Sequence, residues 1–296
     1  MEDPALADMA RWDALLSGCP LFKGFEPYRD FFVAPAIDRM SNLLAECEHG
    51  GPLRFAAQTD ALLADGLHYE QRIAERGIIA TRERASHDLF NAIVWLRHSA
   101  LKRAMNSRQV ADIARVGPKQ RTRGQCALTH FDEAGAIVWL ADPDLAAAWN
   151  AHDWPALFLK NHAAWGSRIA LTVIGHALFD YALEHGEAPV AKALAIHVDK
   201  AEIAARSDAA SIPAWAQAER WMAESIESGR LLADPQELRP LPLAGIPGWH
   251  RGEQSEPFYA TAPCFRPLRP GRRYPAPLIF SGTGTIESVS EHAATG

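Results

Sequence analysis

The chain has 296 residues, of which 48% are hydrophobic and 22% are charged, and its formal net charge is −6. This composition is ordinary for a globular protein and excludes a disordered, collagenous or coiled-coil chain. The net negative charge argues against a surface that is basic throughout, as in proteins that coat nucleic acid or anionic lipid, although it leaves room for a local basic patch.

The four cysteines, at positions 19, 47, 126 and 264, are far apart and form no C-x-x-C pair. Neither a disulfide framework nor a zinc–cysteine cluster is therefore expected. The first residues lack the basic and apolar regions of a signal peptide, and the apolar stretches are too short or too interrupted to cross a bilayer. We accordingly expect a cytoplasmic protein with reduced thiols and no membrane partner; its oligomeric state is left open.

Residues 4–16 and 36–48 are predicted helices, because each follows a proline or an acidic residue and precedes a glycine. The loop between them is rich in aromatic residues and carries more apolar area than a solvated connection would expose. We expect this loop to cap a core through Phe22, Phe25, Phe31 and Phe32.

Two β-hairpins are predicted next. In residues 67–81, alternating apolar residues lead into a Glu-Arg-Gly turn and a second apolar run. In residues 124–141, a similar alternation leads into turn residues at 132–135 and the apolar run 137–140.

Between these hairpins lies the most apolar predicted helix, which has Ser86 as its N-cap and continues to Met105. Apolar residues surround it almost completely, which is typical of a buried central helix. Further helices are predicted over 143–151, 154–164, 168–185 and 213–229, the third ending before Gly186.

Residues 235–280 contain ten of the twenty prolines, and proline is excluded from regular helices and central strands. This segment is predicted to be a long, irregular carboxyl-terminal arm, followed by a flexible tail over 281–296. The predicted architecture is a single α+β domain over 1–280, with a mainly helical core, two β-hairpins and the proline-rich arm packed on it.

Several blocks of sequence, taken in order, resemble a bacterial family catalogued as domain of unknown function 3025. These blocks are HDLFNAIVWLRHSALKRAMN, RTRGQCALTHFDEAG, GHALFDYAL, and LAGIPGWH with the later FYATAPCFRP. The resemblance covers roughly Leu67 to Arg266. It implies a shared architecture but no activity, so the function is sought in the residues themselves.

Polar residues interrupt two of the predicted helices. In the helix that begins at Ser86, His87 and Asp88 lie at the amino end, and Asn91 follows His87 after one turn. The helix dipole lowers the pKa of a histidine at this end, so a neutral His87 would be available as a base or metal ligand. The structural alternative is that Ser86 and Asp88 simply cap the helix.

A similar pattern is predicted in the helix over 168–185, where Thr172, His176 and Asp180 follow one another at four-residue steps. A carboxylate one turn from His176 would orient its imidazole, as carboxylates do for metal-bound histidines. The structural alternative is a solvated polar stripe, although this stripe is narrower than that of an ordinary surface helix.

If the two helices pack together, four of these residues form a cluster of the kind that binds Mn, Fe or Zn and activates water. We therefore expect a small-molecule enzyme, a metal-assisted hydrolase of an anionic phosphate ester or amide. The expected catalytic residues and metal ligands are His87, Asp88, His176 and Asp180, and the expected substrate-binding residues are Asn91, Arg121, Arg123 and Thr172.

The adjacent His87 and Asp88 also resemble the doublet that gives its name to a family of helical, metal-dependent phosphohydrolases, in which His68 would be a further ligand. Cys126 and His130 alternate along a predicted strand, but no third residue that would orient them is evident. The sequences G-x-S-x-G, Walker A and G-x-G-x-x-G are absent.

Two other classes of function remain open. Basic loops with Lys119, Arg121 and Arg123, and with four arginines over 266–273, are suited to phosphate and favour a non-catalytic nucleic-acid or anion-binding protein. Nucleic acid is the less favoured partner, and the same loops are also consistent with solvated turns. Trp249, Phe258 and Tyr259 would suit a docking surface in a structural or interaction protein, or they fasten the arm to its own domain.

Overall fold

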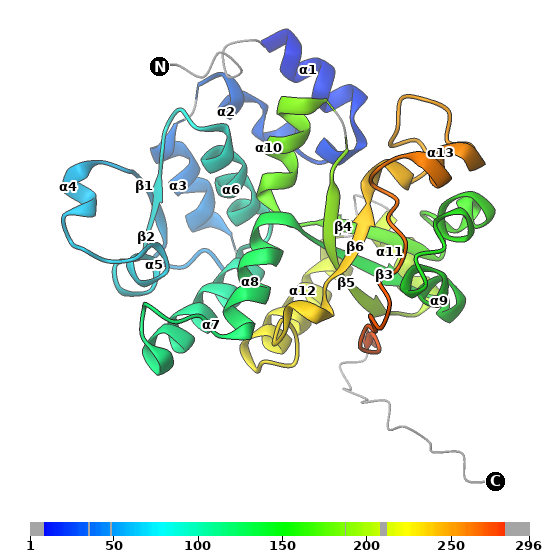
Figure 1. Cartoon of the computed structure of the whole chain (residues 1–296). Helices are drawn as coiled ribbons and strands as arrows, with labels where there is room; N and C mark the ends of the chain where they lie inside the picture. Colours follow the sequence, from blue (N-terminus) through cyan, green and yellow to red (C-terminus); the bar gives the residue numbers. More distant parts are fainter. Residues whose placement is uncertain (1–8, 35, 48, 187, 208–211, 282–296) are drawn as a thin grey trace.

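The computed structural model describes residues 9–34, 36–47, 49–186, 188–207 and 212–281. Within these ranges one part of the chain is mainly helical and the other is built on a mixed β-sheet (Figure 1). The predicted α+β class is confirmed.

The helical part contains the α-helices α1 to α7 and a small parallel sheet of two strands. Its helices are α1 (Met9–Gly18), α2 (Arg29–Val33), α3 (Ile37–Glu46), α4 (Asp60–Leu63), α5 (Tyr69–Arg76), α6 (Ser86–Arg97) and α7 (Ser99–Val116), and its strands are β1 (Arg54–Ala57) and β2 (Ile78–Thr81).

The larger sheet has the strand order β4-β3-β5-β6, and a short β7 also pairs with β5. All six residues of β3 are buried, as expected for an apolar strand covered on both faces. Strand β3 is parallel to β5 and antiparallel to β4. The strands are β3 (Gly135–Leu140), β4 (Ile169–Val173), β5 (Val190–His197), β6 (Arg239–Pro242) and β7 (Leu278–Ile279).

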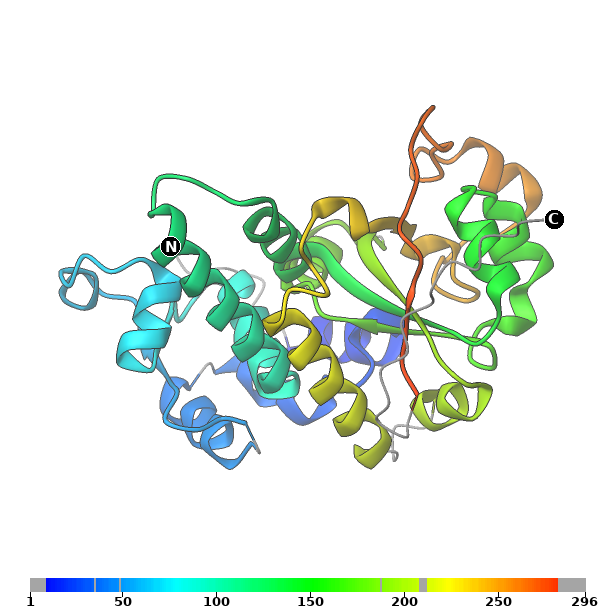
Figure 2. The ribbon, with the colours of Figure 1, turned by 90° about the horizontal axis from the view of Figure 1, so that it is seen from below.

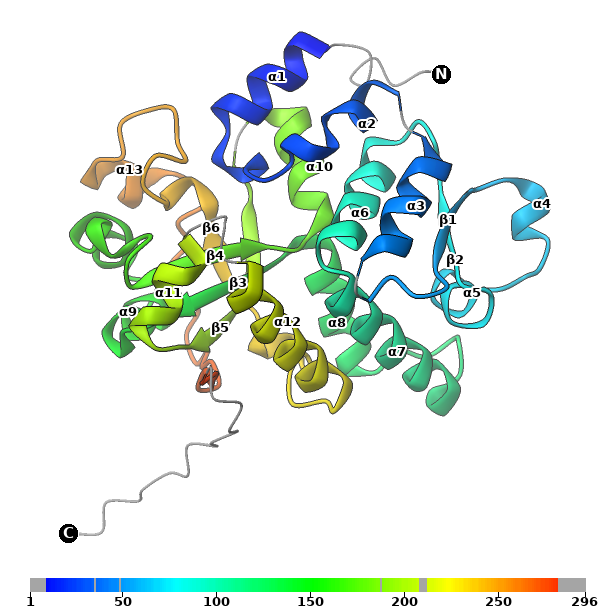
Figure 3. The same ribbon diagram turned by 180° about the vertical axis from the view of Figure 1, so that it is seen from behind.

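Helices surround this sheet and join it to the helical part. Helix α12 lies alongside α7 (Figure 2), and α11 packs against β4 (Figure 3). These helices are α8 (Arg123–Ala134), α9 (Pro143–Asn150), α10 (His176–His185), α11 (Lys200–Ser207), α12 (Ile212–Glu227) and α13 (Glu256–Thr261).

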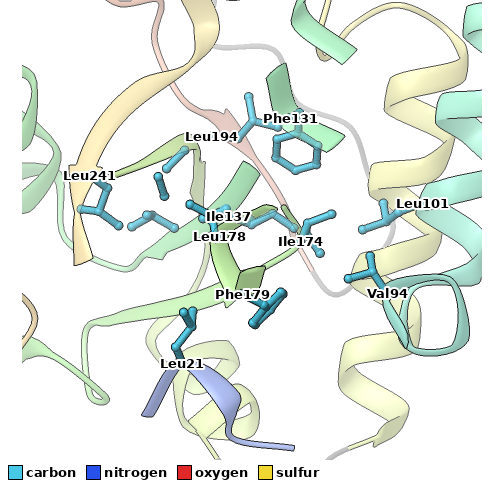
Figure 4. Close-up of a cluster of buried hydrophobic side chains, with 14 of the residues drawn as sticks. Leu21, Val94, Leu101, Phe131, Ile137, Ile174, Leu178, Phe179, Leu194 and Leu241 are labelled. Atoms are coloured by element: carbon cyan, nitrogen blue, oxygen red, sulfur yellow. The ribbon is translucent and has the colours of Figure 1, made fainter. Parts of the chain in front are cut away.

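The aromatic segment near the amino end was predicted to be a loop, but it contains α2, which carries Phe31 and Phe32. Its aromatic side chains are buried in the core, as predicted, and they lie where α6 and α10 meet. The ring centroids of Phe25 and Phe179 are 4.6 Å apart, and those of Phe90 and Phe179 are 5.7 Å apart. Figure 4 shows Phe179 and Leu178 of α10 within the buried hydrophobic cluster. This packing fixes the amino ends of α6 and α10 relative to each other.

The two predicted hairpins are wrong. Residues 69–76 form α5, whose end at Gly77 has the left-handed φ of 65° that the sequence had suggested for a hairpin turn. Residues 123–134 form α8, which begins with a capping box made by Thr122 and Gln125. A short alternating pattern fits either secondary structure, and here the helix-capping residues decide.

Three predicted helices are divided. The helix over 154–164 consists of a π-helix, Pro155–Lys160, and a separate 3-10 helix, His162–Ala164. The helix over 168–185 is in fact β4 followed, after Gly175, by α10, so Thr172 lies on a strand. The helix predicted from Ser86 has Ala85, not Ser86, as its N-cap, and it breaks at His98 into α6 and α7. Because residues 123–134 are helical, Cys126 and His130 lie one helical turn apart and not along a strand.

The carboxyl-terminal arm is irregular for most of its length but contributes β6, α13 and β7. Its aromatic residues attach it to the rest of the described chain: Tyr259 and Phe265 are buried, and their ring centroids lie 5.9 and 6.1 Å from that of Phe158. Of the predicted tail over 281–296, only Ser281 lies within the described residues.

Candidate metal centre

Two histidines from separate helices meet at the amino ends of α6 and α10. The Nε2 atoms of His87 and His176 are 3.0 Å apart, and the two rings meet edge to face. Two nitrogens that each bind one ion at about 2 Å lie roughly 3 Å from each other, so this separation suits a shared ion. The predicted meeting of these imidazoles is found in the structure.

The third member of this cluster is Glu133, which the sequence reasoning did not select. Its Oε2 lies 3.5 Å from Nε2 of His176 and 3.8 Å from Nε2 of His87. The three donor atoms all lie within 4.8 Å of one another, a spacing that could hold a metal ion. We refer to His87, Glu133 and His176 as the candidate triad.

Glu133 lies next to His176 because the junction between α8 and β3 contacts the junction between β4 and α10. The backbone N–H groups of Ile174 and Gly175, which precede α10, both donate to the carbonyl of Gly135, at 3.0 and 2.8 Å. A Cβ on Gly175 would lie 2.3 Å from the Gly135 nitrogen, so only glycine allows this approach. The last turn of α8 therefore faces the first turn of α10.

Asp180 supports the candidate triad from one turn further along α10. Its Oδ2 lies 3.6 Å from Nδ1 of His87, and its Oδ1 accepts a hydrogen bond from Ser86 at 2.5 Å. The pKa of His87 was expected to be lowered by the helix dipole, but interaction with the Asp180 carboxylate raises it instead. Interaction with His87 in turn lowers the pKa of Asp180. Asp180 thus orients His87 through the nitrogen opposite the triad, whereas the sequence had paired it with His176.

Burial separates the protonation behaviour of the two imidazoles. His176 is 3% exposed, and its burial lowers its pKa to about 4, so it is neutral at physiological pH. Burial also raises the pKa of Glu133, with the nearby His87 opposing this effect. A neutral imidazole is the form that binds metal, so His176 needs to lose no proton to act as a ligand.

The candidate triad lies on the wall of a polar cavity of about 460 Å³ between α5, α6, α7 and α8. Such a volume accommodates a small molecule. Besides the triad, the residues that line it include Tyr69, Glu70, Arg82, Asp88, Asn91, Lys102, Asn106, Gln109, Arg121, Gln125, Thr129 and Asp132.

A chain of polar contacts runs along the same wall. Buried Lys102 donates hydrogen bonds to Asp132 and, at 2.9 Å, to Oδ1 of Asn91. Nδ2 of Asn91 in turn donates to the hydroxyl of Tyr69 at 3.0 Å. We call these four residues, Asp132, Lys102, Asn91 and Tyr69, the polar chain.

The remaining predicted site residues divide into two groups. Asn91 and Arg121 line the cavity, as a substrate-binding role requires. Asp88 also lines it, but its carboxylate accepts three hydrogen bonds from Arg82, so we replace Asp88 by Glu133 among the candidate ligands. The geometry therefore does not support the histidine–aspartate doublet as a metal-binding pair.

Arg123 and Thr172 lie outside the cavity. Arg123 forms a salt bridge with Asp234, and the Thr172 hydroxyl accepts a hydrogen bond from the Trp139 indole at 3.1 Å. Thr172 is excluded because residues 169–173 form a strand and only residues from 176 onward belong to the helix. His68 lines the cavity but does not belong to the candidate triad.

A family model described as "Protein of unknown function (DUF3025)" matches residues 53–269. This range includes the candidate triad, Asp180 and the whole polar chain. No curated protein and no solved structure matches the chain. Among the described residues, no helix combines the length and the apolar character that crossing a membrane requires.

Proposed function

Since the chain belongs to the DUF3025 family, whose description assigns no activity, we propose from the site itself that it is a metal-dependent hydrolase of small anionic substrates. The observation that carries this proposal is the convergence of two imidazoles and one carboxylate on the wall of a polar cavity. Three protein ligands leave a coordination position for water or substrate, as in catalytic sites.

The surroundings of the candidate triad support a catalytic site over a structural one. Structural zinc sites are closed by four protein ligands, whereas here the donors face a space of about 460 Å³. Asp180 contacts the imidazole of His87, as carboxylates commonly contact metal-bound histidines. Arg121 supplies a positive charge at the cavity, which favours an anionic substrate.

A bound divalent ion would polarise the scissile group and lower the pKa of water. In the hydrolysis that we propose, the water oxygen forms a bond to the phosphorus or carbonyl carbon, and the bond to the leaving group breaks. One water proton passes to the leaving group, so the reaction needs no oxidant or reductant. His87, Glu133 and His176 would hold the ion, and Arg121 would orient the substrate.

The donor set also favours a second candidate. Two histidines and one carboxylate with open positions are the ligands of non-haem iron(II) oxygenases. Zinc or manganese in the purified protein would support the hydrolase, whereas iron that reacts with dioxygen would support the oxygenase.

Elemental analysis of the purified full-length protein tests the proposal. We expect close to one equivalent of metal in the wild type and its loss in the double variant His87→Ala, His176→Ala. The matched control is His162→Ala, His185→Ala, which removes two exposed histidines outside the cavity and should retain the metal.

An activity assay with phosphate esters and amides then follows, with chelation and metal replacement. Equal metal contents in the wild type and the site variant would overturn the metal centre. A metal-free protein that binds nucleic acid with steep salt dependence would instead support the non-catalytic alternative based on the arginine loops.

A further inference from the structure

The polar chain fixes the direction in which each of its hydrogen bonds points. A lysine ammonium has only donors, so the Asn91 atom that faces Lys102 must be its carbonyl oxygen. The amide nitrogen of Asn91 therefore faces Tyr69 and donates to the phenolic oxygen. Asp132 anchors the other end, because it also accepts a hydrogen bond from Lys102.

This arrangement leaves the hydroxyl proton of Tyr69 available to a ligand. The phenolic oxygen accepts the bond from Asn91, so the Tyr69 proton has to be donated elsewhere. Within the described part of the chain, no side-chain or backbone acceptor is placed to receive it. Both Tyr69 and Asn91 line the cavity. Burial raises the pKa of Tyr69, which keeps the proton on its oxygen.

The polar chain and the candidate triad are neighbours on the cavity wall. Asn91 follows His87 by one turn of α6, and Asp132 directly precedes Glu133 on α8. The charge of Asp132 acts on both Tyr69 and His176, so the two groups share one electrostatic environment. Tyr69 and the candidate triad line the same cavity, so one ligand bound there can contact both.

We propose that Tyr69 donates a hydrogen bond to an oxyanion, the phosphate group of a phosphate ester or free phosphate, bound in the cavity beside the candidate triad. This inference rests on the proposed metal-dependent function and adds the substrate class and a residue that contacts it. Phosphate suits the site because it offers several acceptor oxygens, which can face a metal ion, a phenol and an arginine together. The Tyr69 proton is shared with the ligand and is not transferred.

Calorimetric titration with inorganic phosphate tests this role. Wild type, Tyr69→Phe and Tyr181→Phe are each loaded with one equivalent of Zn²⁺ and freed of excess metal. Tyr181 is an exposed tyrosine of α10 outside this cavity, so its variant is the matched control. We expect phosphate binding to weaken roughly ten- to hundred-fold in Tyr69→Phe, the effect of losing a hydrogen bond to a charged group, and to be unchanged in Tyr181→Phe.

A second pair of variants leaves Tyr69 itself in place. Asn91→Asp presents a carboxylate that attracts the Tyr69 proton away from the ligand, and Asn106→Asp adds the same charge to another part of the cavity wall, beside Glu70. The larger loss of phosphate affinity is expected in Asn91→Asp. Equal losses in these two variants would count against the proposed proton direction.

The possible failures can be told apart because the affinities for Zn²⁺ and Mn²⁺ are measured first. Wild-type protein that binds neither Zn²⁺ nor Mn²⁺ would overturn the proposed function, and with it the role of Tyr69. Wild-type protein that binds Zn²⁺ but no phosphate, or a Tyr69→Phe variant with wild-type phosphate affinity, would overturn only the role of Tyr69. The melting temperature and Zn²⁺ affinity of each variant show whether its fold is intact.

Discussion

Asp180 illustrates how a residue that is not in the candidate triad can set the affinity of the site. It contacts Nδ1 of His87 and so favours the ring orientation in which Nε2 faces His176. Replacing it by asparagine keeps the size of the side chain but removes the charge. We expect Asp180→Asn to weaken Zn²⁺ binding by about 10- to 100-fold, as measured by competition with a chromophoric chelator.

The control for this prediction is Glu184→Gln, four residues further along α10. Its carboxylate is exposed and lies near His185, away from the candidate triad. It also loses one negative charge, so any general electrostatic effect on metal binding is shared by both variants. Similar affinities in the two variants would show that Asp180 does not orient His87.

A second prediction at the level of single residues concerns the pH dependence of stability. Arg72 is 2% exposed and its guanidinium donates two hydrogen bonds to Asp65, at 2.6 and 3.1 Å. Interaction with Arg72 lowers the pKa of Asp65 below its ordinary value of 3.8, and the Leu67 N–H and the charge of Arg76 act in the same direction. The pair therefore stabilises the fold at pH values above the ordinary pKa of 3.8. This contribution is lost as the pH falls through the lowered pKa of Asp65 in the folded protein.

We expect Asp65→Asn to reduce the free energy of unfolding at pH 7 and to differ less from the wild type near pH 3. Urea denaturation of both proteins at the two pH values measures this. Asp60→Asn serves as the control, because Asp60 is an exposed residue of the neighbouring α4. A difference between Asp65→Asn and the wild type that grows on acidification would contradict the assignment.

At the scale of elements, the site depends on the contact between the α8–β3 and β4–α10 junctions. A methyl group at Gly175 would meet the backbone of Ala134 and Gly135 at 2.3 to 2.5 Å, so one junction must move. We expect Gly175→Ala to cost about 1–3 kcal/mol of stability and to weaken metal binding, since His176 follows directly. At Gly18 a Cβ would meet nothing within 4 Å. In Gly18→Ala the free energy of unfolding should therefore change by no more than about 0.5 kcal/mol.

Thermal unfolding and Zn²⁺ titration of both glycine variants check this prediction. Gly175→Ala with normal stability and metal affinity would mean that the two junctions adjust without moving His176. In that case, the packing of α6 against α10 alone would position the candidate triad.

The elements with clear start and stop signals could be predicted from the sequence. Helices α3, α9 and α12 lie close to their predicted ranges, since proline or acidic residues precede them or they carry one apolar face. Strand β5, over Val190–His197, was not predicted because its residues follow a segment assigned to a helix end. Its place in the middle of the sheet comes from pairing with β3, and distant pairing leaves little trace in local sequence.

The candidate site was partly predictable, because some of its residues leave a local signal in the sequence and others do not. His87, His176 and Asp180 interrupt apolar surfaces and could be selected, whereas Glu133 was placed in a hairpin turn. Lys102 looks like a solvated helical lysine. On one continuous helix, Asn91 and Lys102 would be about 16 Å apart along the axis. The helix breaks at His98, where no glycine or proline predicts a break. The break lets Nζ of Lys102 approach Oδ1 of Asn91 to 2.9 Å.

At the scale of the whole molecule, the candidate site joins the helical part to the sheet. His87 comes from α6, whereas Glu133 and His176 come from α8 and α10, next to β3 and β4. The buried hydrophobic residues of the described chain form one cluster that extends from Trp12 to Phe280. The prediction of a single domain over residues 1–280 therefore implies that both parts unfold together.

Phe280 allows this prediction to be tested far from the site. It is 2% exposed, packs on Trp221 and follows β7, and its N–H donates to the His197 carbonyl of β5 at 2.8 Å. We expect Phe280→Ala to cost about 3–5 kcal/mol while a single transition is kept, with coincident tryptophan fluorescence and far-ultraviolet circular dichroism. Val33→Ala, at a side chain that is 40% exposed, should change stability by no more than about 0.5 kcal/mol. Two separate transitions, with only one lowered by Phe280→Ala, would instead divide the chain into two folding units and place the candidate triad at their interface.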